Sequence, residues 1–250
     1  MFYSALHSVL MSWGDVRPAV AALAEASQSE NWSLEEISAT ATNTLKLLGQ
    51  NGDPRADAVA WRYFDALLLH DVMDTFHINT MLGLCTSADQ IEKVIGAAGL
   101  WSPSRPSRYS SSHRGQLMDG NDRELTYELA SRAWLRIGHV EHAASTLAES
   151  SASVGGWGKK KLRRKVVSQL RALFEDAASN KDDALHEKAQ AYFFALHGRG
   201  LTDQHSCKLV LRWCRDDGSG QGTEAAAIRE AIEQAGMSAD GIHPGQRHRK

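Results

Sequence analysis

The residues best suited to bind a ligand form a dense run of basic side chains in the second half of the chain. Six of the seven positions from 159 to 165 are cationic, and no acidic residue intervenes before Glu175. These cations, with one that follows them, are Lys159, Lys160, Lys161, Arg163, Arg164, Lys165 and Arg171. They begin a segment of helical periodicity, where they repel one another and the helix dipole also disfavours them. A polyanion such as RNA would relieve both penalties, through contacts that weaken with salt. The alternative interpretation is a solvated helix face or a nuclear-import-like tract.

A second basic segment, rich in Ser and Pro, follows Trp101. Its cations are Arg105, Arg108 and Arg114. Because the segment has few apolar residues, we expect it to be extended or disordered in isolation. Its Arg, Tyr and Ser side chains could wrap around RNA by stacking and by binding phosphates, and a plain flexible insertion explains the composition equally well. The basic tail 247–250 is interpreted as a frayed end.

Residue patterns typical of enzymes and of metal sites are missing. The Gly-rich stretch 218–222 lacks a preceding strand and a lysine, and is interpreted as a flexible turn rather than a phosphate-binding loop. His139 and His142 stand three positions apart at a helix start, but a zinc site would need a further ligand nearby. We therefore expect a protein that is not an enzyme, with no cofactor and no bound metal.

Cysteine usage and hydropathy bound the environment of the chain. The three cysteines, Cys85, Cys207 and Cys214, form an odd and sparse set that fits a reducing compartment and not a disulfide framework. Cys207 and Cys214 would lie roughly 10 Å apart along a helix, too far for a disulfide. No apolar run reaches the length of a membrane-spanning helix, so no membrane insertion is expected. The first residues run directly into a helical pattern and show no convincing targeting peptide.

Hydrophobic periodicity indicates an all-α protein, because no segment alternates with the period of a strand. Twelve helical segments are expected in six consecutive pairs. The pairs are 3–13 with 16–26, 34–48 with a helix that Asp53 and Pro54 begin, 75–85 with 90–98, 125–137 with 140–149, 160–178 with 183–197, and 204–214 with 223–235. Paired helices repeated every 35 to 45 residues, roughly, are typical of an α-solenoid.

Two of these pairs align closely. Tyr3 precedes Gly14 by eleven positions, and Tyr127 precedes Gly138 by the same eleven. Each glycine is followed by a polar residue, by Val and, three residues later, by Ala, which lets the second helix approach the first closely. These alanines are Ala19 and Ala143. Four tryptophans fall at inward-facing helical positions and are expected in the core: Trp13, Trp61, Trp134 and Trp213.

The aligned residues carry a family resemblance. The stretches 2–16 and 126–140 resemble the pentatricopeptide repeat (PPR), residues 74–85 are similar again, and 198–203 resembles the linker between two such repeats. The resemblance covers about four of the six expected pairs. It implies a right-handed superhelix of about six helix-turn-helix hairpins. The repeats are uneven in length, and the third is one residue short.

The same resemblance implies an organellar RNA-binding protein, in a mitochondrion in preference to a chloroplast. Members act in RNA processing, stability, editing or translation, and some are built into mitochondrial ribosomes. In regular members an early residue of the first helix helps to read one base. By position these residues are Ser4, Asn79 and Glu128, but the repeat ends are out of register, so their partners are unassigned. Protein binding of the tetratricopeptide (TPR) type is the neighbouring interpretation.

The formal net charge of −2 conceals a strong asymmetry. Residues 1–74 contain four Lys/Arg and ten Asp/Glu, whereas residues 101–171 contain thirteen Lys/Arg and six Asp/Glu. The net charge of −2 therefore excludes only a nucleic-acid binder that is basic along its whole length. The hypothesis is a non-catalytic RNA-binding subunit of a mitochondrial ribosome or similar ribonucleoprotein, and the alternative is a TPR-like scaffold for protein subunits. The expected organisation is acidic repeats 1–100, a Ser/Arg-rich insertion 101–120, repeats 121–238 with the basic helix 159–171, and a basic tail 239–250.

Overall fold

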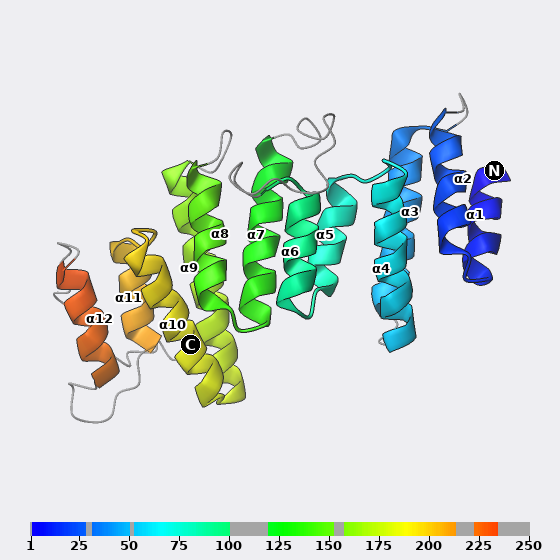
Figure 1. The fold of residues 1–250 in the computed structure, drawn as a ribbon. Coiled ribbons are helices and arrows are strands. Elements are labelled where there is room, and N and C mark those ends of the chain that lie inside the picture. Colours follow the sequence, from blue (N-terminus) through cyan, green and yellow to red (C-terminus); the bar gives the residue numbers. More distant parts are fainter. Residues whose placement is uncertain are drawn as a thin grey trace. The chain divides into compact units, whose positions relative to one another are not determined.

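The computed structural model describes residues 2–28, 32–50, 53–100, 120–152, 158–213 and 223–234. Every regular element in these ranges is an α-helix, so the prediction of an all-α chain is confirmed over the described residues (Figure 1). The helices there are α1 (Phe2–Ser12), α2 (Val16–Gln28), α3 (Leu34–Gln50), α4 (Pro54–Leu69), α5 (Thr75–Leu84), α6 (Ala88–Ala97), α7 (Gly120–Arg136), α8 (Val140–Ala152), α9 (Lys159–Asn180), α10 (Asp183–Gly198), α11 (Gln204–Trp213) and α12 (Thr223–Gln234).

The chain divides into two compact units, residues 1–133 and 134–250, which are described one at a time. The boundary falls inside α7, between Ala133 and Trp134. This helix begins at Gly120, earlier than the start at Leu125 that the apolar pattern predicts. The predicted insertion residues Arg105, Arg108 and Arg114 lie outside the described residues, and so does the basic tail 239–250.

The N-terminal unit is built from helices that pack in pairs and in alternate rows. α1 packs against α2, α3 against α4, and α5 against α6. Contacts between pairs join every second helix, α2 with α4 and α3 with α5. Leu23, Leu45, Tyr63, Phe64 and Met81 lie almost completely buried between these helices. The arrangement is helical-repeat-like, because each pair buries its apolar face against the next pair.

The two aligned pairs of the sequence end their first helices in the same way. Gly14 and Gly138 both adopt left-handed backbone, with φ of 80° and 88°, a conformation that favours glycine. The next amide donates back to the end of the preceding helix in each case, with 2.9 Å from Asp15 N to Leu10 O and 2.9 Å from His139 N to Trp134 O. The two alanines predicted to allow close helix approach, Ala19 and Ala143, are fully buried.

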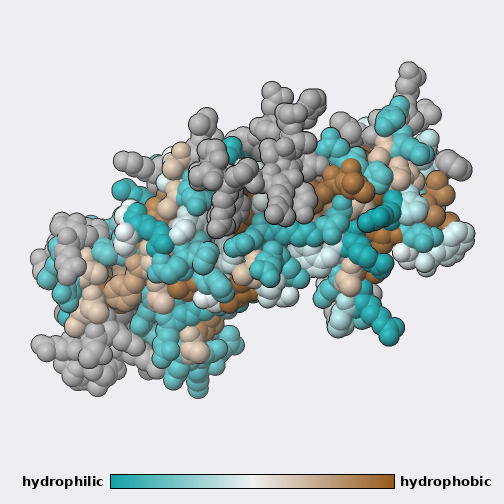
Figure 2. All heavy atoms as spheres, viewed as in Figure 1, coloured by the Kyte–Doolittle hydropathy of each residue, from teal (hydrophilic) through white to brown (hydrophobic). Residues whose placement is uncertain are grey.

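The prediction that Trp13 lies in the core is wrong. Trp13, in the turn after α1, is 72% exposed, and Val9 on α1 is 44% exposed. Among the α1 residues whose burial is described, His7 is the buried one, and its Nε2 lies 2.8 Å from the Tyr63 hydroxyl oxygen on α4. Because His7 is polar, a pattern built from apolar residues alone does not identify the buried side of α1. Figure 2 shows brown hydrophobic surface on helices of this unit, among teal hydrophilic residues.

The C-terminal unit repeats the same packing pattern. α9 packs against α10 and α11 against α12, while α8 contacts α10 and α9 contacts α11. Trp134, Phe174, Tyr192 and Phe193 are almost completely buried, and Trp134 therefore meets its prediction. Trp213 is half-buried, with its ring stacked on Phe174 at 6.5 Å between centroids.

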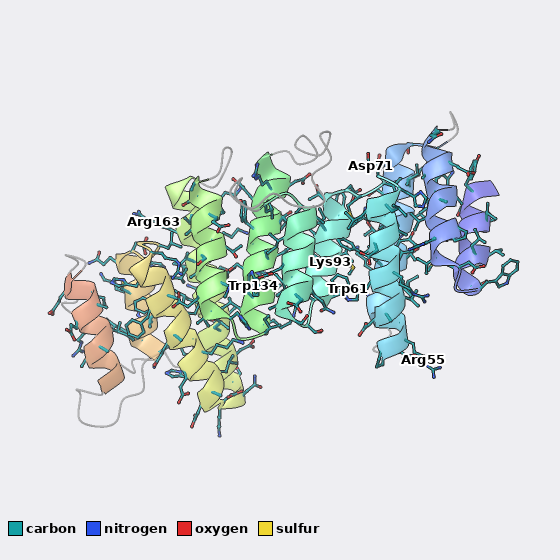
Figure 3. The ribbon with its side chains drawn as sticks, in the orientation of Figure 1. Arg55, Trp61, Asp71, Lys93, Trp134 and Arg163 are labelled. Atoms are coloured by element: carbon teal, nitrogen blue, oxygen red, sulfur yellow. The ribbon has the colours of Figure 1, made fainter. Side chains whose placement is uncertain are left out.

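The remaining core predictions have mixed outcomes. Cys85 and Cys207 are buried and are not part of a disulfide, while Cys214 lies outside the described residues. Burial is the main cause that raises the pKa of the Cys207 thiol to about 11. Trp61 is only half-buried, so its prediction is met only in part, and Lys93 Nζ lies 5.5 Å from its ring centroid (Figure 3).

Candidate nucleic-acid interface

The basic run forms the first turns of α9, a helix held in place by its apolar face. Leu162, Val166, Leu170 and Phe174 recur every four residues and are buried, in a helix that packs against α10 and α11. The first turn contains no acidic residue, and Gly158 at the N-cap makes no side-chain hydrogen bond. Tertiary packing therefore holds α9 in place, although the positive N-terminal end of its helix dipole has no acidic residue or side-chain cap to compensate it.

The opposite side of α9 carries what we call the α9 basic face: Lys160, Arg164 and Arg171. All three side chains are exposed, and at about 100° per residue they fall within a sector of roughly 40°. The stripe spans roughly 16 Å of helix, given the rise per residue. Among the described residues none of the three has an ion-pair partner, so their charge is available to a ligand.

The other predicted cations of the run are placed differently. Arg163 Nε lies 3.8 Å from Asp203 Oδ2, and Lys161 and Lys165 have partners within the protein. Asp203 also caps α11, because its Oδ1 accepts the Ser206 amide at 2.9 Å. The Arg163 contact therefore brings the N-terminal ends of α9 and α11 together (Figure 3). The side chain of Lys159 lies outside what the structure describes.

Helix α11 carries basic residues that the sequence analysis missed. Lys208 and Arg212, preceded by His205, follow one another at helical spacing on the side away from the buried Cys207 and Val210. The three-and-four spacing of His205, Lys208 and Arg212 was visible in the sequence, but its link to the run at 159–165 depends on the packing of α9 on α11. Toward the end of α9, exposed Glu175 and Asp176 follow the α9 basic face.

The three predicted base-reading residues lie in different surroundings. Ser4 is half-buried on α1. The Asn79 side-chain oxygen accepts a hydrogen bond from the Thr126 hydroxyl at 2.9 Å. Glu128 is 5% exposed and its Oε1 lies 2.7 Å from Arg132 Nη2. The polar atoms of Asn79 and Glu128 are therefore engaged inside the protein, and base reading by these residues stays a prediction.

A cluster of Ser, Asp and His in the N-terminal unit joins two helices. Asp74 caps α5, since its Oδ1 accepts the His77 amide at 3.0 Å, and the Asp74 amide donates to His77 Nδ1 at 3.0 Å. The Ser38 hydroxyl of α3 donates to the Asp74 carboxylate and not to an imidazole. The geometry of nucleophilic catalysis requires a hydroxyl bonded to the base. The cluster is a helix cap that anchors α5 to α3.

The histidine pair of the sequence packs on a tryptophan. The His142 and His139 ring centroids lie 4.8 and 5.6 Å from that of Trp134. Within the described part of the chain, no group of three or more His, Cys, Asp or Glu side chains could hold a metal ion. In the same part of the chain, no helix combines the length and the apolar character needed to cross a membrane.

Comparison with known proteins gives no match: no family model, no curated protein and no solved structure is similar to this chain.

Proposed function

We propose that this protein binds RNA through the α9 basic face. The observation that supports the proposal is that Lys160, Arg164 and Arg171 are exposed in one stripe without ion-pair partners among the described residues. Cations held apart in this way repel one another, and phosphates would remove the repulsion while releasing counterions. Contacts of this kind would hold a strand of RNA along its backbone and would not read it base by base.

The finer architecture belongs to the same proposal. We propose that the paired helices continue as a PPR-like α-solenoid, a view supported by the alternate-row packing in each unit and by the matching turns at Gly14 and Gly138. The residue pattern resembles that family, whose members work in organelles. A non-catalytic subunit of a mitochondrial ribosome or similar ribonucleoprotein is the role that irregular repeats and backbone binding would suit.

Salt-dependent binding of a labelled single-stranded RNA tests the proposal. The affinity is measured between about 50 and 200 mM salt, a range in which phosphate contacts weaken strongly. The Lys160→Gln/Arg164→Gln variant should bind about tenfold more weakly. Its plot of log affinity against log salt should be shallower by about 0.7 for each phosphate that the variant no longer neutralises.

The matched control removes the same charge elsewhere. Lys46→Gln/Arg55→Gln changes two exposed cations of the N-terminal unit and should retain wild-type affinity and slope. Equal binding by the two double variants would overturn the role of the α9 basic face. Wild-type protein that shows no salt-dependent binding would overturn RNA binding itself.

A second candidate function, a TPR-like scaffold for protein subunits, is favoured by one observation. Val9 and Trp13 are exposed apolar residues on α1 and in the turn that follows it, in a segment that carries ten acidic residues against four basic ones over residues 1–74. Exposed aromatic residues are common at the centres of protein interfaces. A Trp13→Ser variant that loses co-purifying protein while retaining RNA binding would support the scaffold, and unchanged partners would remove this observation.

A further inference from the structure

The N-terminal unit contains a cavity unrelated to the α9 basic face. It has a volume of about 400 Å³ and lies between the turn that joins α1 to α2 and the C-terminal half of α4. Arg17 and Asp15 line it from the start of α2, and Arg62, Asp65 and Leu69 line it from α4. The volume is within the range of cavities that hold small molecules.

The charges around this cavity do not cancel. Arg17 and Arg62 are exposed, and neither has an ion-pair partner among the described residues. Asp65 is already neutralised, because its Oδ1 lies 2.5 Å from Lys93 Nζ. Asp15 is left as the one acidic lining residue without a described partner, so the lining carries two guanidinium groups against one carboxylate.

Guanidinium groups from two different helices are suited to a ligand with several oxygen atoms. Arginine presents a planar set of donors that matches the oxygens of a carboxylate or phosphate in pairs. Leu69 is 68% exposed and lines the same cavity, so it offers apolar contact beside the two cations. A ligand with an anionic group and a short apolar portion fits both features.

We propose that this cavity binds a small organic anion through Arg17 and Arg62, which hold its phosphate or carboxylate group. Leu69 contacts the carbon skeleton of the ligand. Asp15 limits the affinity by repulsion, and Lys93 supports binding by keeping the charge of Asp65 neutralised. The site does not depend on RNA binding, since none of its residues belongs to the α9 basic face.

Isothermal titration calorimetry at constant ionic strength tests this site with defined probes. Inorganic phosphate and succinate are titrated separately, with chloride as the reference anion, so that the two kinds of anionic group are distinguished. The wild type should bind at least one probe saturably. Arg17→Gln/Arg62→Gln should bind it at least tenfold more weakly, because charge-assisted hydrogen bonds are the strong ones. Asp15→Asn should bind more tightly, because it removes the carboxylate that repels the anion. The variant should still fold, since asparagine can replace aspartate at a helix start.

The control is Arg55→Gln, which removes one cation from the same helix away from the cavity. Figure 3 shows Arg55 at the opposite end of α4 from Asp71, and its side chain is exposed. It should bind the probe as the wild type does. The proposal is overturned if neither probe binds saturably, or if the double arginine variant, the Arg55 variant and the wild type bind alike. Should the double arginine variant fail to fold, the gain expected for Asp15→Asn decides: unchanged or weaker binding contradicts the site.

Discussion

The Nε2 atom of His7 lies 2.8 Å from the hydroxyl oxygen of Tyr63, and this buried hydrogen bond joins α1 to α4. Burial raises the pKa of the Tyr63 hydroxyl, which therefore keeps its proton. Burial also lowers the pKa of His7 from its ordinary 6.5, which favours the neutral imidazole. The two shifts favour a hydrogen bond between two neutral side chains.

Burial of His7 should make the protein less stable in mild acid. Because the folded pKa of His7 is lowered, the unfolded chain takes up the proton first as the pH falls below 6.5. The His7 contribution is therefore complete above pH 6.5 and declines below it. Urea unfolding followed by circular dichroism at several pH values should show this slope in the wild type. His7→Gln, which does not titrate, should show a smaller slope, and an identical slope would contradict the prediction.

Removing the partner hydroxyl tests the same hydrogen bond at neutral pH. Tyr63→Phe leaves His7 buried without its hydrogen-bond partner, which should lower the free energy of unfolding by about 1 to 3 kcal/mol. Tyr3→Phe is the control, since its side chain is only half-buried. If both variants have the wild-type midpoint in urea, the hydrogen bond contributes nothing measurable.

Asp74 should matter for stability through its position before α5. Burial by itself raises the pKa of this carboxyl, but hydrogen bonds from His77 and Ser38 outweigh it and lower the pKa below 3.8. A lowered carboxyl pKa contributes stability that is present above pH 3.8 and lost as the pH falls through the folded pKa. Asp74→Ala should cost about 1 kcal/mol or more at pH 7.

Asp74→Asn separates the cap from the charge. Asparagine can still accept the His77 amide, so most of the stability at pH 7 should remain. The part of the stability that Asp74 loses in acid should disappear in this variant. Thermal unfolding at pH 7 and below about pH 4, on either side of the ordinary carboxyl pKa, would detect the difference. An asparagine variant as unstable at pH 7 as the alanine variant would show that the charge, and not the cap, is required.

The features predicted correctly from sequence are those set by neighbouring residues. Asp53 and Pro54 begin α4 as expected, with the Asp53 carboxylate accepting the Arg55 amide at 2.9 Å. Ala19 and Ala143 are buried because the turn before each brings two adjacent helices together.

The features that sequence reasoning missed depend on helices distant in the chain. Trp13 is exposed in the turn after α1, and on α1 itself His7 is buried where it contacts Tyr63 on α4. Arg17 and Arg62 line one cavity only because α2 packs against α4. Nothing in the local pattern of either arginine indicates the other, so contacts of this kind could not be predicted without the fold.

The ion pair between Arg163 and Asp203 should contribute little by itself. The pair is at 3.8 Å with the arginine side chain 56% exposed, and exposed pairs are typically worth about 0 to 1 kcal/mol. Arg163→Gln should therefore leave the melting temperature nearly unchanged. Asp203→Ala should be clearly destabilising, by about 1 kcal/mol, because it removes the cap of α11. Equal effects of the two substitutions would show that the ion pair, not the cap, carries the stabilisation.

Glycine substitutions should have opposite signs at two kinds of position. Gly14 and Gly138 have open space where a Cβ would stand, so an alanine there meets no neighbour and suffers only from the positive φ. Gly14→Ala should destabilise by about 1 to 2 kcal/mol, the cost of left-handed backbone for a residue with a Cβ. Gly83 is the penultimate residue of α5 and has equally open space, and Gly83→Ala should stabilise by about 0.5 to 1 kcal/mol because the unfolded chain loses freedom. Chemical denaturation of both variants measures the difference, and a stabilising Gly14→Ala would show that the left-handed turn shared by the two aligned helix pairs is not required.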